Sequence, residues 1–84
     1  MGPDCLTFRL KGDLAAPEFR DWMARHSRKL GVSVEGIRAS AHRMEIATRG
    51  QYDMLEAFAL ACSLGPRDVY VETMEIVGPK PMGD

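Results

Sequence analysis

Alternating apolar and polar residues predict a first β-strand at residues 5–11, with three apolar side chains on one face. After a turn, a helix is predicted to begin near Pro17, because its ring-fixed φ and the acidic residue that follows suit a first helical turn. Gly31 is expected to end this helix as a C-cap. The apolar stripe of the helix consists of Phe19, Trp22, Met23, His26 and Leu30.

Two further strands are predicted at residues 32–39 and 43–49, joined by a hairpin that turns near residues 40–42. Alternation is clear in the second of these strands and weaker in the first. A second helix is expected to start around Gln51 and to stop at Gly65, because glycine caps a helix and the proline after it cannot continue one. Its buried side is expected to carry Leu55, Phe58, Ala59 and Cys62.

The last strand is predicted from Val69 to Val77. Its apolar phase shifts along the strand, which indicates either a bulge near Thr73 or a place at the edge of the sheet. The resulting order, β-α-β-β-α-β, predicts an α+β ferredoxin-like sandwich, with four antiparallel strands covered on one face by two helices. We expect a single domain over residues 1–77 and a flexible C-terminal tail over residues 78–84.

Composition and charge narrow the function classes. The chain has 84 residues, 45% of them hydrophobic, and a net charge of -1. This balance lacks the electrostatic footprint of a general nucleic-acid or anionic-membrane binder, so neither partner is expected. Cys5 and Cys62 lie too far apart in the sequence for a thiol metal or redox motif, and no metal or cofactor is expected. No apolar run suits export or a membrane span, so the expected location is the cytoplasm.

The ferredoxin-like fold hosts enzymes, RNA binders, metal carriers and ligand sensors, so individual residues must separate these functions. The strand at 43–49 offers no aromatic side chain on which an RNA base could stack. The loop after the first strand contains no Cys, His or Met for metal transfer. His26 and His42 lie far apart and are accompanied by no serine nucleophile motif, so a hydrolytic triad is not indicated.

The segment from Gly12 to Arg20 resembles the phosphate loop of the acylphosphatase family, which reads G-x-V-Q-G-V-G-F-R at the same spacing. The resemblance covers roughly residues 5–77, which is nearly the whole predicted domain. Three further matches follow without a gap. They are Leu30-Gly31-Val32 for the family's Leu-Gly-Leu, Met44-Glu45-Ile46 for its Val-Glu-Val, and Gly65-Pro66 for the Gly-Pro that closes its second helix.

In the acylphosphatase family, loop amides and the loop arginine hold the phosphate of an acyl phosphate, and an asparagine on the second strand orients the attacking water without a metal. The resemblance implies catalytic positions at Arg20, which matches the loop arginine, and at Arg38, which aligns with the asparagine. Helix-terminal amides and a guanidinium suit this chemistry, because both stabilise negative charge on phosphate oxygens. The implied anion-binding residues are Gly12, Ala15, Ala16, Glu18, Phe19 and Arg20.

The loop also departs from the family pattern. Two of the family's glycines are replaced by residues that carry a Cβ, and Pro17 has no N–H to donate. Glu18 brings a negative charge to the place where the anion is expected, which weakens binding. Because the chain contains no asparagine, Arg38, Ser40 or Gln51 would have to position the water instead, and Arg38 has only donors to offer.

Three functions remain open from the sequence. The first is an acylphosphatase-like hydrolase of weak or lost activity that binds a small phosphorylated or anionic ligand at residues 12–20. The second is a non-catalytic domain on the same fold that binds a protein partner or a small ligand. The third is a ligand sensor that forms a homodimer through the edges of its sheet.

Overall fold

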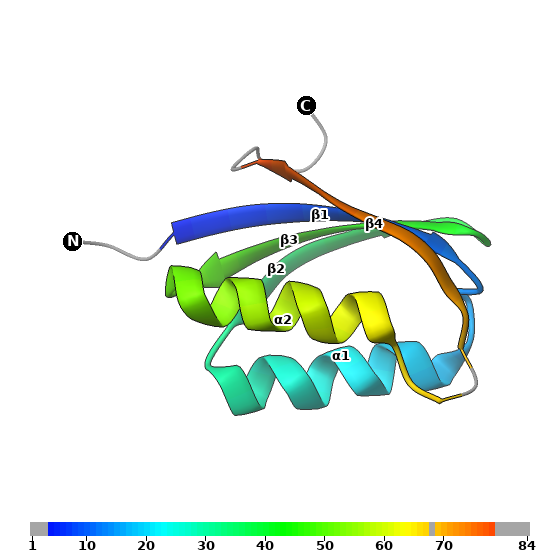
Figure 1. Ribbon diagram of the computed structural model, residues 1–84, viewed down its shortest axis with the longest axis horizontal. Coiled ribbons are helices and arrows are strands. Elements are labelled where there is room, and N and C mark those ends of the chain that lie inside the picture. The colour runs from blue at the N-terminus through cyan, green and yellow to red at the C-terminus, as the bar shows by residue number, and fades with distance from the viewer. Residues whose placement is uncertain (1–3, 68, 79–84) are drawn as a thin grey trace.

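The computed structural model describes residues 4–67 and 69–78, and over these residues the chain forms a two-layer sandwich (Figure 1). The sheet has the strand order β2-β3-β1-β4, and each neighbouring pair is antiparallel. Both helices cover one face of it, which confirms the ferredoxin-like α+β prediction. The elements are β1 (Asp4–Gly12), α1 (Pro17–Leu30), β2 (Ser33–Ala39), β3 (Arg43–Gly50), α2 (Tyr52–Leu64) and β4 (Val71–Gly78).

The core lies between the helices and the sheet, and period-2 alternation in the central strands builds its floor. Phe8 of β1 and Ile46 of β3 are directly paired in register and fully buried. Phe58 of α2 covers them, with its ring centroid 6.2 Å from that of Phe8. The four residues predicted for the buried side of α2 are all buried, because a helical stripe and a strand face present apolar side chains to the same layer.

The final strand differs from its prediction at one end. β4 begins at Val71 and not at Val69, because the Val69 amide donates a hydrogen bond to the Pro66 carbonyl (3.1 Å) and remains in the preceding loop. The register of β4 against β1 shifts next to Thr73, and β4 is also an edge strand, so both explanations for its uneven pattern apply. The strand ends at Gly78, and the rest of the expected tail lies outside the described residues.

An irregularity in β2 was not anticipated. Its register against β3 shifts between Val34 and Gly36, so that Glu35 is an extra residue in the ladder. Val34 packs against the core before this bulge and Ile37 does so after it. The alternation is therefore reset, and Arg38, opposite Glu45 in the register, projects from the face of the sheet that the helices leave uncovered.

Candidate functional site

The loop between β1 and α1 is fixed at its start by two other segments. The Gly12 amide donates to the His42 carbonyl (2.9 Å), and the Asp13 amide donates to the Tyr70 carbonyl (2.8 Å). A Cβ at Gly12 would lie 2.9 Å from the Cα of Val71, and Gly12 has a φ of +151°. Close backbone approach and backbone conformation together therefore require glycine here.

The end of the loop leads directly into the helix. Ala16 is the N-cap residue of α1, with extended backbone angles and no side-chain cap, and Pro17 opens the first turn. The Phe19 amide donates to the Ala16 carbonyl (3.0 Å), and the Phe19 ring is fully buried. Within the described part of the chain, no backbone carbonyl accepts from the amides of Ala15 or Ala16. These two amides are among the donors that the loop leaves for a ligand.

Two charged side chains of opposite sign occupy the first turn of α1. Glu18 and Arg20 are both exposed, and neither forms an ion pair with any described residue. A guanidinium at a helix N-terminus is unfavourable for the helix dipole, whereas a carboxylate is favourable. This turn therefore presents a cation and backbone amides to an anion, but it also places a carboxylate where that anion would bind.

The second predicted catalytic residue lies elsewhere. Because of the β2 bulge, Arg38 lines a cavity of about 250 Å³ on the uncovered face of the sheet, together with Arg9, Ser40 and Arg43. No residue of the 12–20 loop lines this cavity. Of the two alternatives to Arg38, Ser40 lies in the same cavity, whereas Gln51 is the N-cap of α2, at the far end of β3.

The uncovered face carries a cluster of cations that the sequence reading overlooked. Arg9 lies between two carboxylates, with its guanidinium nitrogens 3.3 Å from Glu45 and 3.2 Å from Glu75. Lys11 and Arg43 sit directly opposite each other in the β1–β3 register, an arrangement that is unfavourable for like charges. The sequence could have revealed this pair if the polar residues of the first strand had been aligned with those of the strand at residues 43–49.

Neither a reactive buried thiol nor a metal-binding cluster is found among the described residues. Cys62 is fully buried in the core, and desolvation raises the pKa of its thiol to about 12, so the thiol stays neutral. No group of three or more His, Cys, Asp or Glu side chains among residues 4–67 and 69–78 could hold a metal ion. None of the described helices has the length and apolar character needed to cross a membrane.

Comparison with known proteins identifies the fold. An acylphosphatase from Coxiella burnetii superimposes with a TM-score of 0.77 and 16% sequence identity, over 99% of this chain and 90% of that one. An acylphosphatase from Bacillus subtilis gives 0.78 and 17%, over 94% and 89%. The C-terminal domain of the MgtC protein from Mycobacterium tuberculosis gives 0.65 and 16%, over 92% and 88%. No protein-family model and no curated protein matches the sequence.

Proposed function

We propose that this chain, which has an acylphosphatase-like fold, binds a small phosphorylated anion at residues 12–20 and hydrolyses acyl phosphates slowly or not at all. The observation that supports binding is the first turn of α1, where the amides of Ala15 and Ala16 have no backbone acceptor among the described residues and Arg20 is unpaired. Amides at a helix N-terminus combined with a guanidinium form a favourable phosphate site.

Five features of the loop and of the rest of the chain argue for slow chemistry. Pro17 contributes no N–H, and the Phe19 amide already donates within the chain. The carboxylate of Glu18, at a separation of about 5 Å, would repel each charge of a bound phosphate by about 1–3 kcal/mol at an intermediate dielectric. Arg38 projects from the uncovered face of the sheet, and the chain has no asparagine to orient water.

The experiment has a binding arm and a turnover arm. Titration with inorganic phosphate, followed by amide NMR shifts, should move residues 12–20 in the wild type and leave them unmoved in Arg20→Gln. Glu18→Gln should tighten binding, because it removes the repelling charge. Arg38→Gln is the matched control, since it removes a guanidinium on the other face of the sheet. Equal shifts in the wild type and in Arg20→Gln would refute the site.

In the turnover arm, the rate of phosphate release from benzoyl phosphate is measured. We expect a rate close to that of the uncatalysed reaction in buffer, and equal rates for the wild type and Arg20→Gln. Rapid turnover that is lost in Arg20→Gln would show instead that the domain is an active acylphosphatase. Turnover that is lost in Arg38→Gln would contradict the placement of Arg38 outside the site.

A second candidate function is binding of an acidic protein surface by the uncovered face of the sheet. The like-charged pair Lys11 and Arg43, with Arg38 on the neighbouring strand, favours a partner that supplies carboxylates. A protein that binds in this way should lose affinity with added salt and in Arg43→Gln, whereas Arg20→Gln should leave its affinity unchanged.

A further inference from the structure

Beside α2, helix α1 carries an aromatic pair that is held by hydrogen bonds. The indole N–H of Trp22 donates to the Ala61 carbonyl of α2 (3.0 Å). Nδ1 of His26 lies 2.9 Å from the Trp22 carbonyl oxygen, and because a carbonyl can only accept, the imidazole donates this bond. The centroids of the two rings are 4.2 Å apart, and the ring planes are tilted by 34°. Both side chains are half-buried, so the pair is fixed in position while its outer surface remains accessible.

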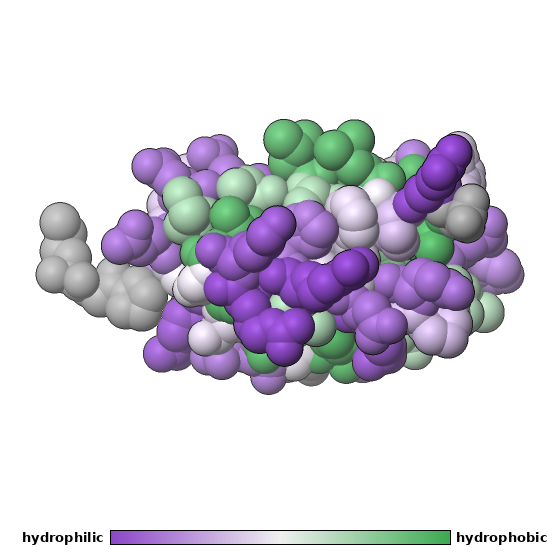
Figure 2. Space-filling view, turned by 90° about the horizontal axis from the view of Figure 1, so that it is seen from below, coloured by the Kyte–Doolittle hydropathy of each residue, from purple (hydrophilic) through white to green (hydrophobic). Residues whose placement is uncertain are grey.

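Three cations of the same helix lie close to this pair in the sequence. Among the described residues, none of Arg25, Arg28 and Lys29 forms an ion pair. The helix dipole favours Arg28 and Lys29, which lie in the last turn, but it does not account for Arg25. Arg25 and Lys29 are four residues apart on the helix, so their charges repel each other. Figure 2 shows strongly hydrophilic side chains gathered over the middle of the helical face.

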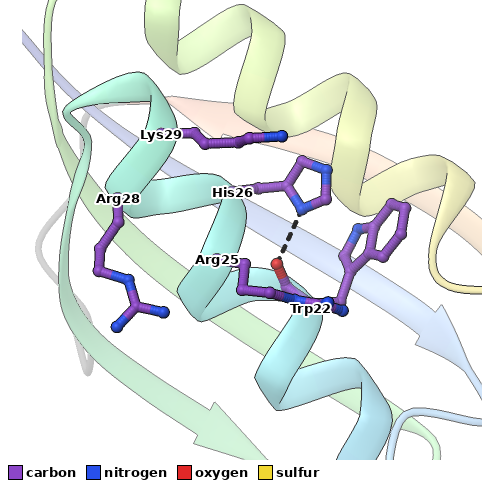
Figure 3. Close-up of a pocket in the computed structure, with 5 residues that line it drawn as sticks. All are labelled: Trp22, Arg25, His26, Arg28 and Lys29. Atoms are coloured by element: carbon purple, nitrogen blue, oxygen red, sulfur yellow. Dashed lines mark hydrogen bonds between the residues drawn. The ribbon is translucent and has the colours of Figure 1, made fainter.

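The five side chains line one cavity of about 520 Å³ (Figure 3). Arg25 and Lys29 extend to the side of α1 that carries the two rings, whereas Arg28 points to the opposite side. The cationic groups offer only donors, which excludes a cationic ligand and favours a phosphate or carboxylate. The indole and the aliphatic stems of the long side chains add an apolar wall, and the volume exceeds what a bare phosphate ion needs.

We propose that this cavity binds an organic phosphate, a phosphate group joined to an aromatic or other flat apolar body. Arg25 and Lys29 hold the phosphate oxygens, and the outer surface of the Trp22–His26 pair contacts the apolar body. The site is built from residues 22–29 of α1 and shares no residue with the 12–20 loop, so it does not depend on the function proposed for that loop.

The test uses Trp22, the single tryptophan of the chain, as an internal reporter. Phenylphosphonate, an aromatic phosphate analogue that cannot be hydrolysed, is titrated while fluorescence is recorded, and calorimetry gives the dissociation constant independently. We expect saturable binding with a fluorescence change. The double variant Arg25→Gln/Lys29→Gln should bind at least about tenfold more weakly, as expected for the loss of charge-assisted hydrogen bonds.

Two control variants distinguish this site from general charge effects and from the loop. Arg49→Gln removes an exposed cation of β3 that lines neither this cavity nor the 12–20 loop, and Arg20→Gln removes the loop guanidinium. In both variants the dissociation constant reported by Trp22 fluorescence should stay within about twofold of the wild type, and circular dichroism checks that each variant is folded. An Arg20→Gln loss with no loss in the double variant would assign binding to the loop and overturn the proposal.

Three other outcomes would also overturn the proposal. If inorganic phosphate changed Trp22 fluorescence with the same dissociation constant as phenylphosphonate, the Trp22–His26 pair would contribute nothing to binding. Absence of saturation by phenylphosphonate, with binding only to vesicles containing phosphatidylserine, would identify the face as a membrane surface. Equal affinity of the wild type and the folded double variant would remove Arg25 and Lys29 from the site.

Discussion

Replacement of Gly12 by alanine should severely destabilise the protein, because the new Cβ would meet the backbone of another strand. The atom would lie 2.9 Å from the Cα of Val71 and 3.0 Å from the amide nitrogen of Glu72, and it would come closer still to the carbonyl oxygen of Tyr70. Backbone atoms cannot rotate away as the end of a flexible side chain can. Movement of this segment would also break the hydrogen bond from the Asp13 amide to the Tyr70 carbonyl.

The magnitude combines two costs. A non-glycine residue held in an unfavourable φ region costs about 1–3 kcal/mol, and forcing an extra carbon into a packed region costs about 1–3 kcal/mol. We therefore expect Gly12→Ala to lower the free energy of unfolding by about 2–6 kcal/mol. Gly31→Ala is the matched control, because Gly31 has a φ of +68° but a Cβ there would meet nothing within 4 Å. Only the left-handed backbone cost of about 1–2 kcal/mol applies to it.

Urea denaturation, followed by Trp22 fluorescence and by circular dichroism, gives the free energy of unfolding of each variant. Gly12→Ala should be the less stable of the two or should fail to fold. A Gly12→Ala protein as stable as Gly31→Ala would refute the reasoning, because it would show that β4 and the segment before it can move away at no cost. The same outcome would mean that the start of the 12–20 loop is not held as described.

Other substitutions and reagents test the core, the cysteines and the sheet surface. Phe58→Ala should lower the free energy of unfolding by about 3–5 kcal/mol in urea denaturation, because it empties a fully buried site in the core. Arg9→Gln should change it by less than about 1 kcal/mol, since the Arg9 side chain is 51% exposed and water screens both of its ion pairs. At pH 8, a thiol-specific disulfide reagent should modify the exposed Cys5 at once and Cys62 only after denaturant is added. The Cys62 thiol has an ordinary pKa of 9.0 in the unfolded chain, and burial raises it to about 12 in the folded protein. Between these values the unfolded state loses the proton first, so the free energy of unfolding falls as the pH rises. Relative to Cys62→Ala, the wild type should lose about 1.4 kcal/mol per pH unit there, and parallel curves for the two proteins would refute the assignment.

The sequence predicted the fold because strand and helix periodicities were locally consistent. Alternation in residues 5–11 and 43–49 identified the two central strands, and Gly31 and Gly65 marked the ends of the helices. The bulge at Glu35 could not be predicted in this way, because an extra residue is defined only by the strand against which it pairs. That single residue decides the face of the sheet from which Arg38 projects.

The candidate sites were harder to predict from the sequence than the fold. Periodicity placed Trp22 and His26 correctly on the inward stripe of the first helix, but a period indicates direction and not depth. The structure shows both rings half-buried at the rim of the helix layer, in a cavity that they share with cations of the same helix. The hydrogen bond from the Gly12 amide to the His42 carbonyl likewise depends on a tertiary contact, so the loss of this amide as a phosphate ligand followed only from the structure.

The central position of β1 has a consequence for the order in which the protein can fold. The first strand pairs with β3 on one side and with the last strand on the other, and the Arg9–Glu75 ion pair joins residues 66 positions apart. On a ribosome, the emerging chain can therefore assemble β1, α1, β2, β3 and α2, but it leaves one edge of β1 unpaired until β4 is synthesised and released. Closure of the sheet is a late, long-range step, and until then the nascent chain exposes a hydrophobic strand to which chaperones or a second nascent chain can bind.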